Sequence, residues 1–419
     1  MKTYTTISLG CKVNAYEISA LTSRLQELGY KEDNDNPDVA IINTCSVTAT
    51  ADQKSRQHIR KLINNYPNAV VVVMGCYSQG QHLFIKNEIK ADIITGTSNR
   101  DKIVELITSF KKGDEPIDLT ESNPRLYQYE ELGLTSHFEN VRAYLKIQDG
   151  CDNFCSYCLI PYRRGKSRSR NFDEIIKEAE AIVRQGYQEI VLTGIHVGGY
   201  GKDLKDVSFS KLVKALLDIK GLYRLRISSI EESEIDDQLI ELINTRDNLA
   251  KHFHIPLQSG SDSVLKRMNR KYNKEQFLSK IKAIKKACPD VTLTTDVIVG
   301  FPGETEEEFV ESYNFIKECG FNMLHCFPFS SREGTVAARM KDQIDPRIKK
   351  ERNLRLIELS NRLWDEYTNK FVNTEVEVLV EQYDEANNYN VGHTSNYLEV
   401  KISGEKPEIG KIIKTIYKK

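Results

Sequence analysis

The sequence lacks long hydrophobic runs, lacks an excess of charge of either sign and is poor in cysteine. No apolar run approaches the ~18 residues that a membrane-spanning helix needs, so no membrane association is expected. The start, MKTYTTISLG, has no charged segment followed by an apolar stretch, which argues against a secretory signal and favours a cytoplasmic location. With 59 basic and 60 acidic residues the net charge is −1, which excludes a globally basic nucleic-acid binder but not a local basic patch.

Nine cysteines in 419 residues are too few for a disulfide scaffold. Hydrophobic residues make up 40% of the chain and charged residues 28%, an ordinary globular mixture with enough apolar material for large cores. At roughly 150 residues per domain, the length predicts two or three domains.

Residues 1–112 alternate strand and helix patterns, with predicted strands at 4–9, 39–42, 70–74 and 92–95. Short links between them predict an N-terminal α/β domain, a parallel sheet covered by helices. Residues 113–140 are polar and lack a clean period, and we interpret them as a linker.

Residues 141–366 alternate again and predict a central α/β domain. Strands are expected at 143–147, 189–193, 224–228, 253–255, 292–299 and 322–326. Six strand–helix units fall short of the eight that close a barrel, so a partial (β/α)6 barrel is expected. A long helical pattern covers 345–370, and residues 367–419 then predict a small antiparallel β-barrel of about five strands.

Three cysteines lie close together in the run KIQDGCDNFCSYCLIPYRRG; we call Cys151, Cys155 and Cys158 the loop triad. They follow the first strand of the central domain, where folds of this class place their chemistry. Three thiolates with no fourth Cys or His in the loop differ from a closed zinc site and from a cluster held by four cysteines. On a four-iron cluster they would leave one iron open. The alternatives are a zinc knuckle with a distant ligand, or chance clustering.

Three further cysteines are dispersed in sequence, in SLGCKVN, INTCSVT and VMGCYSQ; we call Cys11, Cys45 and Cys76 the dispersed triad. Each follows a predicted parallel strand and precedes a helix, and ligands collect at the carboxyl ends of such strands. Neighbouring strands would bring the three thiols together, whereas the alternative is three small buried residues. For Cys288, Cys319 and Cys326 packing is the better interpretation.

The loop triad resembles the cluster motif of radical S-adenosylmethionine (SAM) enzymes. Together with SLGCKVN, NTC, GC and the final β segment, it makes residues 1–419 resemble the methylthiotransferases of that superfamily. SLGCKVNAYE, NTCSVTATADQKSRQ and IPYRRGKSRSR are most similar to the branch acting on N6-threonylcarbamoyladenosine beside the tRNA anticodon. Sister branches act on N6-isopentenyladenosine in tRNA or on an aspartate of a ribosomal protein.

The resemblance implies two 4Fe-4S clusters. The loop triad would hold the one whose open iron binds SAM, and its electron would yield a 5′-deoxyadenosyl radical that takes hydrogen from adenine C2. The dispersed triad would hold an auxiliary cluster carrying the sulfur that becomes the methylthio group. No side chain is assigned as an acid or base, because such C–H chemistry is delegated to cofactors.

The resemblance also places SAM contacts at neighbouring strand ends: Thr193, Gly194, Ser229, Glu231, Gln258, Val299 and Gly300. Thr-Gly stands at 193–194 where many radical SAM enzymes have Gly-Gly-Glu. Turn geometry alone can account for Gly300 and Gly303, and Gln258 and Glu231 can equally be helix caps.

Residues 160–170, IPYRRGKSRSR, carry five basic side chains and no acidic one: Arg163, Arg164, Lys166, Arg168 and Arg170. Beside the loop triad, these residues are expected to position tRNA phosphates. The alternatives are a solvated basic loop, or an arginine that contacts SAM. The resemblance makes the C-terminal barrel an RNA-binding (TRAM-like) domain for the anticodon arm.

The implied partners are tRNA, a low-potential electron donor such as flavodoxin or ferredoxin, and a sulfur donor. A hypothesis of a different class is a non-catalytic, metal-bound RNA-binding protein. It predicts RNA binding without formation of deoxyadenosine, although the long two-site α/β body is much larger than such a module needs.

Overall fold

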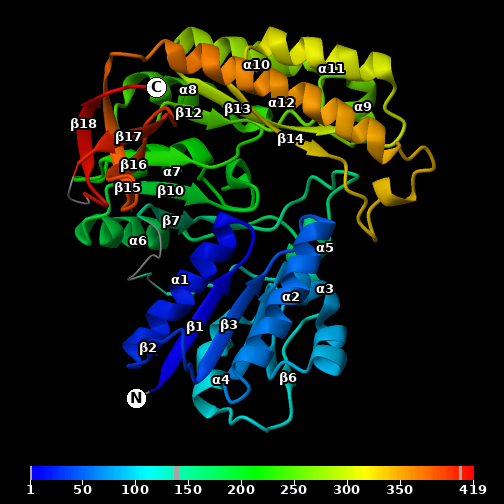
Figure 1. Ribbon diagram of the computed structural model, residues 1–419, viewed down its shortest axis with the longest axis vertical. Coiled ribbons are helices and arrows are strands. Elements are labelled where there is room, and N and C mark those ends of the chain that lie inside the picture. The colour runs from blue at the N-terminus through cyan, green and yellow to red at the C-terminus, as the bar shows by residue number, and fades with distance from the viewer. Residues whose placement is uncertain (1, 134, 136–140, 405–407) are drawn as a thin grey trace.

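The computed structural model describes residues 2–133, 135, 141–404 and 408–419 (Figure 1). In Figure 1 an α/β domain, drawn in blue, lies below a central body of green and yellow elements, and the red C-terminal sheet lies against that body. This confirms the predicted fold class, while the predicted domain boundaries stay predictions. Within the described residues, no helix combines the length and the apolarity needed to cross a membrane.

The N-terminal sheet has six parallel strands in the order β2-β1-β3-β4-β5-β6. The strands are β1 (Thr3–Ser8), β2 (Lys31–Glu32), β3 (Val39–Thr44), β4 (Val70–Gly75), β5 (Ile93–Ile94) and β6 (Ile117–Asp118). The helices are α1 (Lys12–Glu27), α2 (Ala49–Asn65), α3 (Cys76–Phe84) and α4 (Ile103–Ser109). The two central strands, β3 and β4, are buried along their whole length, as expected where helices cover both faces.

Part of the predicted linker, residues 113–140, is instead a strand. β6 pairs in parallel with β5 and extends the N-terminal sheet. A strand of two residues is too short to show an alternating pattern, so the sequence carries no period there. Positions 134 and 136–140 of this segment lie outside the described residues.

The central domain contains six parallel strands in chain order, which confirms the partial barrel. They form two sheets, β7-β10-β11 and β12-β13-β14, and a bridge between Leu225 and Leu249 connects the two. The strands are β7 (Ala143–Lys146), β10 (Glu189–Thr193), β11 (Arg224–Ile227), β12 (His252–His254), β13 (Thr292–Val299) and β14 (Met323–Pro328). The covering helices are α6 (Phe172–Arg184), α7 (Phe209–Leu217), α8 (Asp237–Thr245), α9 (Asp262–Arg267), α10 (Lys274–Ala287) and α11 (Glu306–Cys319).

Three cysteines pack in the central core, as predicted. Cys288 and Cys319 are buried in it, and Cys326 packs against it.

The C-terminal region is a long helix followed by a curled antiparallel sheet (Figure 1). The helix is α12 (Pro346–Asn369), and the strands are β15 (Glu375–Asp384), β16 (Tyr389–Thr394), β17 (Glu399–Ser403) and β18 (Ile412–Ile416). Their order is β17-β16-β15-β18, so the described residues form an open half-barrel of four strands rather than about five.

A buried carboxylate, Glu189, joins the central domain to the C-terminal sheet. It accepts hydrogen bonds from Arg226 Nε at 2.6 Å and from Arg224 Nη1 at 3.0 Å. Arg226 also donates to the backbone carbonyls of Thr394 and Ser395, both at 3.1 Å. The guanidinium groups therefore connect a central carboxylate to the backbone of the C-terminal sheet.

Replacing Glu189 with Gln should lower the free energy of unfolding by roughly 3 kcal/mol, because buried guanidinium groups lose their anion. Burial would raise the pKa of Glu189, but Arg226 and Arg142 lower it to about 2. Since the folded pKa lies below the unfolded one, this stabilisation is present above roughly pH 4.5 and is lost as the pH falls toward 2. Urea unfolding at pH 7 and at acid pH measures both effects.

The matched control is Glu174→Gln, which removes an exposed carboxylate paired with Lys177 and should change unfolding little. Equal stability of wild type and Glu189→Gln at neutral pH would contradict the role of Glu189.

Candidate functional site

A short antiparallel ribbon frames the loop triad. β8 (Gln148–Asp149) pairs with β9 (Arg168–Ser169), so the cysteine-bearing loop leaves and returns at one place. Gly150, immediately before the loop triad, has φ +72°, and a Cβ there would lie 1.9 Å from the Lys166 carbonyl oxygen. The ribbon therefore requires glycine at this position.

The loop triad is half-buried, and hydrogen-bond donors point at its sulfur atoms. The backbone N–H of Asn153 donates to Cys151 Sγ at 3.5 Å, and that of Ile160 donates to Cys158 Sγ at 3.4 Å. Arg270 Nη1 donates to Cys155 Sγ at 3.3 Å. Donors of this kind stabilise thiolates, so the loop triad fits an anionic metal cluster.

Burial raises the pKa of Cys158 to about 12. The thiol is therefore protonated at neutral pH without a metal, and metal binding would release that proton.

A cavity of about 190 Å³ lies beside Cys155. Its lining includes His196, Glu231, Glu234 and Arg270. Burial alone would lower the pKa of His196, but hydrogen bonds to the Cys151 thiol and the Glu234 carboxylate raise it to about 10. Arg270 and protonated His196 thus place positive charge beside the loop triad.

The dispersed triad converges at one end of the N-terminal sheet. Cys11 follows β1, Cys45 follows β3 and Cys76 follows β4, and these three strands are adjacent. Cys76 interacts electrostatically with both Cys11 and Cys45, and Cys45 interacts with Cys11. The expectation that neighbouring strands bring these thiols together agrees with this arrangement.

One polar side chain and two glycines shape the strand ends at the dispersed triad. Asn14 Nδ2 donates to the carbonyls of Leu9 and Thr44, at 2.7 and 3.1 Å. A Cβ at Gly10 would lie 2.5 Å from Cys45 Sγ, and one at Gly75 would lie 2.3 Å from a side-chain oxygen. Both glycines also have positive φ, so the residue before Cys11 and the residue before Cys76 have little freedom to change.

Arg164 connects the two triads. It ends α5 (Ile160–Arg164), the helix that follows Cys158, and its Nε donates to Cys76 Sγ at 3.2 Å. Its other nitrogens donate to Glu17 at 2.9 Å and to Asp149 at 3.1 Å. The helix that follows the loop triad therefore contacts the dispersed triad at Cys76.

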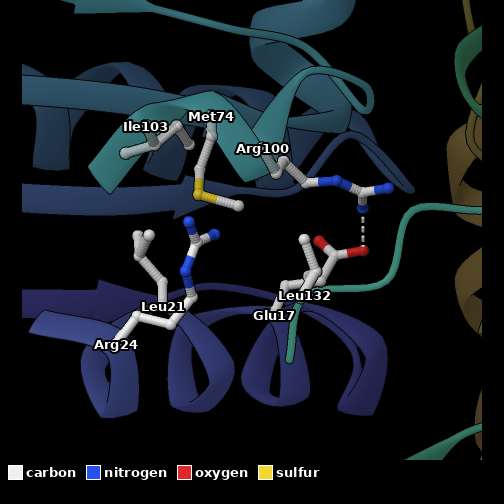
Figure 2. A pocket seen from close by; sticks show the side chains of 7 residues that line it. All are labelled: Glu17, Leu21, Arg24, Met74, Arg100, Ile103 and Leu132. Atoms are coloured by element: carbon white, nitrogen blue, oxygen red, sulfur yellow. Dashed lines mark hydrogen bonds and ion pairs between the residues drawn. The ribbon is translucent and has the colours of Figure 1, made fainter. Parts of the chain in front are cut away.

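A buried ion-pair cluster surrounds Arg164. Its carboxylates belong to Glu17, Glu130 and Asp149, and its cations to Arg100, Lys146, Arg164 and Arg168. Figure 2 shows Arg100 reaching Glu17 beside the apolar Met74 and Ile103. Burial opposes ionisation of Glu17, yet the surrounding cations hold its pKa well below the usual range. Four cations meet three carboxylates here, and one of these cations, Arg164, also donates to Cys76.

The expectation that the basic run contacts RNA is corrected for three of its five members. Arg164 and Arg170 are fully buried, and Arg168 is nearly so. Arg170 pairs with Glu178 and Glu131. Their guanidinium groups are engaged by carboxylates and carbonyls, because the run folds inward along the ribbon. Lys166 is exposed and Arg163 is half-buried, so a surface role remains a proposal for these two.

Among the predicted SAM contacts in the first half of the barrel, only Glu231 is beside the loop triad. Glu231 pairs with Arg270, the residue that donates to Cys155. Thr193 is buried and its hydroxyl donates to a carbonyl within β10. A Cβ at Gly194 would lie 3.1 Å from Gln148 Oε1. Ser229 lines a different, larger cavity.

The predicted contacts on β13 and the preceding loop have mostly structural surroundings. Gln258 has φ +65° and its backbone bridges Val297. Val299 is buried at the end of β13. Gly300 has φ +67°, so the turn alone accounts for glycine there. Ligand contacts at these positions stay proposals.

Several site residues escaped sequence reasoning: Asn14, Glu17, Asp149, His196 and Arg270. Arg270 comes from a segment far from the cysteine motif, and no local pattern marks it. Glu17 follows the motif SLGCKVN, and Asp149 is the first residue of DGC. Their position near the cysteines in sequence was therefore a usable signal. Across the part of the chain that the structure describes, no three His, Cys, Asp or Glu side chains lie close enough together to bind a single metal ion. A four-iron cube binds each thiolate through a different iron and takes a wider spacing.

Comparison with known families follows the same division of the chain. Residues 145–316 match the Radical SAM superfamily, and residues 3–96 match a family described as Uncharacterized protein family UPF0004. The methyltransferase TsrM from Kitasatospora setae, a radical SAM protein, shares the fold with a TM-score of 0.57 at 13% identity, covering 78% of this chain and 73% of that one.

Curated relatives match nearly the whole length. Threonylcarbamoyladenosine tRNA methylthiotransferase MtaB of Bacillus subtilis (strain 168) is 48% identical over 413 residues, covering 97% of this chain and 92% of that protein. The protein of the same name from Aquifex aeolicus (strain VF5) is 34% identical, covering 98% of each chain. The tRNA-2-methylthio-N(6)-dimethylallyladenosine synthase of Thermoanaerobacter pseudethanolicus is 37% identical, covering 96% of this chain and 87% of that protein.

This chain belongs to the radical SAM methylthiotransferase family. Membership implies an enzyme that uses SAM and a 4Fe-4S cluster.

Replacing Arg164 with Met should lower the free energy of unfolding by roughly 3–5 kcal/mol, because Glu17 and Asp149 lose a buried cation. Arg164→Lys keeps the charge but cannot reproduce the planar set of donors. Its free energy of unfolding should therefore lie between those of wild type and Arg164→Met. Urea denaturation measures both. Arg347→Met, at an exposed position on α12, is the control and should unfold like wild type. Wild-type stability in Arg164→Met would show that the cluster does not hold the domains together.

Proposed function

We propose that this enzyme adds a methylthio group to C2 of N6-threonylcarbamoyladenosine next to the anticodon of tRNA. The observation that supports the proposal most directly is the hydrogen bond from Arg164, on the helix that follows the loop triad, to Cys76 of the dispersed triad. Sulfur transfer onto a carbon activated by a SAM-derived radical needs both sites to reach one substrate atom. The 48% identity to an MtaB protein, against 37% to a dimethylallyladenosine synthase, favours the threonylcarbamoyl substrate.

We assign one 4Fe-4S cluster to the loop triad and a second to the dispersed triad. When bound, the first supplies the electron that cleaves SAM and the second supplies the sulfur. Arg270 and the N–H groups around the loop triad offset the charge of its thiolates. Arg164 does the same at Cys76.

SAM is assigned to the cavity beside Cys155, with Glu231 as one lining residue. Lys166 and Arg163 are the members of the basic run left to contact tRNA phosphates, and the C-terminal sheet is proposed to orient the anticodon arm. A low-potential electron donor such as flavodoxin or ferredoxin and a separate sulfur donor complete the reaction, which we place in the cytoplasm.

The two triads can be separated by substitution. After anaerobic reconstitution the wild type should hold about eight irons, and Cys155→Ala and Cys45→Ala about four each. Cys155→Ala should form no deoxyadenosine from SAM and reductant, whereas Cys45→Ala should form it but transfer no sulfur. Iron analysis and chromatography of the nucleoside products measure these outcomes.

Cys326→Ala is the matched control, because this thiol packs against the core and should leave iron content and both activities intact. Loss of deoxyadenosine in Cys45→Ala together with normal formation in Cys155→Ala would reverse the assignment. A wild-type protein that binds RNA without cleaving SAM would support the non-catalytic hypothesis instead.

The substrate can be read from tRNA of a strain lacking this gene. Loss of the 2-methylthio group from threonylcarbamoyladenosine alone, restored by the wild-type gene but not by Cys45→Ala, is expected. Mass spectrometry of tRNA nucleosides measures it. Loss from isopentenyladenosine, or unchanged tRNA, would favour a sister branch.

A further inference from the structure

All three domains contribute to a cavity of about 370 Å³ inside the partial barrel. Lys12 comes from the N-terminal domain, and Tyr397 from the C-terminal sheet. Strands β10 to β14 and the two residues after β11 supply the rest, and the polar and charged members of that part are Arg226, Ser228, Ser229, His252, His254, Thr294, Asp296 and His325. We call this cavity the chamber.

A hydrogen-bonded chain crosses one wall of the chamber. His254 Nε2 lies 3.3 Å from Asp296 Oδ1, and its Nδ1 lies 2.9 Å from Thr294 Oγ1. His252 Nε2 lies 3.0 Å from the same Thr294 oxygen. If the carboxylate accepts from His254 Nε2, then Thr294 donates to His254 Nδ1 and accepts from His252 Nε2. The chain therefore leaves His252 Nδ1 as an acceptor.

His252 Nδ1 has no hydrogen-bond partner among the described residues, although His252 is only 7% exposed. Buried polar atoms are normally satisfied, so an acceptor left open in a cavity indicates a ligand that donates to it. Tyr397 lies over the imidazole with ring centroids 4.9 Å apart and holds it in place.

The two side-chain cations that line the chamber, Arg226 and Lys12, differ in their partners. Arg226 is met by Glu189, whereas Asp296, the carboxylate in the lining, accepts from neutral His254. Lys12 forms no ion pair within the described ranges, and its ammonium acts on both His252 and His325. Burial and the nearby cations hold the pKa of His252 well below its ordinary value, so the imidazole is neutral and Lys12 is the cation available to an anionic ligand.

Lys12 directly follows Cys11 of the dispersed triad. On adenine, C2 and N6 lie on either side of N1, on the same edge of the ring. A base whose C2 faces the dispersed triad therefore turns its N6 substituent along the same wall, toward Lys12 and the chamber.

We propose that the chamber binds the N6 substituent of the substrate, with the Lys12 ammonium pairing with the threonyl carboxylate and His252 Nδ1 accepting from its hydroxyl or ureido N–H. This inference rests on the proposed function and names the residues that select its substrate. An isopentenyl group offers neither an anion to Lys12 nor a donor to His252, so it would leave the buried His252 Nδ1 unpaired inside the protein.

The test measures binding rather than turnover. Three RNA hairpins of the anticodon arm differ only at the base beside the anticodon, which is threonylcarbamoyladenosine, isopentenyladenosine or adenosine. Fluorescence anisotropy with the full-length, anaerobically reconstituted protein gives the affinities. We expect wild type to bind the threonylcarbamoyl hairpin roughly ten-fold tighter than the adenosine hairpin, as one charge-assisted contact provides.

Lys12→Met and His252→Phe should each reduce that preference to about two-fold or less while leaving the adenosine hairpin unaffected. Lys282→Met, which removes an exposed lysine on α10, is the control and should keep the full preference. Iron content and thermal melting confirm that each variant is loaded and folded. Lys12 is exposed, so its substitution tests the proposal even if His252→Phe folds poorly.

The outcomes separate this inference from the proposed function. A wild-type preference for threonylcarbamoyladenosine that survives in Lys12→Met and in folded His252→Phe overturns the chamber assignment and leaves the proposed function standing. A wild-type preference for the isopentenyl hairpin overturns both. Equal wild-type affinity for all three hairpins overturns the chamber assignment, while tRNA nucleoside analysis decides the function separately.

Discussion

The contact on which the arrangement depends is the buried guanidinium of Arg164, which at once touches Cys76, Glu17, Asp149 and Asn14. It comes from the central domain, and three of its partners come from the N-terminal domain. Ion pairs buried to this extent add little net stability, because desolvation offsets the attraction. What they contribute is position, since a buried charge tolerates only the geometry that satisfies it. The ion pairs around Arg164 thus fix the positions of two domains that each carry one cysteine triad.

The electrostatics of the two triads follow a common design. In each triad burial raises the pKa of one thiol, Cys76 and Cys158, although Cys11 is exposed. Each triad also has a guanidinium group donating to one sulfur, Arg164 at Cys76 and Arg270 at Cys155. The arginines offset the negative charge that a cluster of thiolates would bring. Both arginines reach their cysteine from another part of the chain.

Sequence reasoning located the strands because buried parallel strands leave continuous apolar runs, as in VVVVM of β4 and VAII of β3. It also anticipated the convergence at Cys11, Cys45 and Cys76, because parallel topology puts the carboxyl ends of adjacent strands together. It failed where the outcome depends on the direction in which a side chain points. The basic run 160–170 looks like a surface patch, yet two of its arginines turn inward. Arg164 pairs with Glu17, which is distant in sequence, and Arg170 pairs with Glu178 on the following helix. β6 was missed because two residues carry no period.

The ribbon of β8 and β9 has a consequence for how this chain can vary. It ties the two ends of the cysteine loop together, Gly150 touches the backbone of Lys166, and Arg164 must still reach Cys76 from within that loop. Exchanging an exposed side chain in this stretch leaves that geometry intact, whereas changing the length of the stretch does not. Adding or deleting one residue would rotate α5 by about 100° and carry its terminal arginine away from the opposing sulfur. Related chains should therefore show substitutions in this stretch but no insertions or deletions.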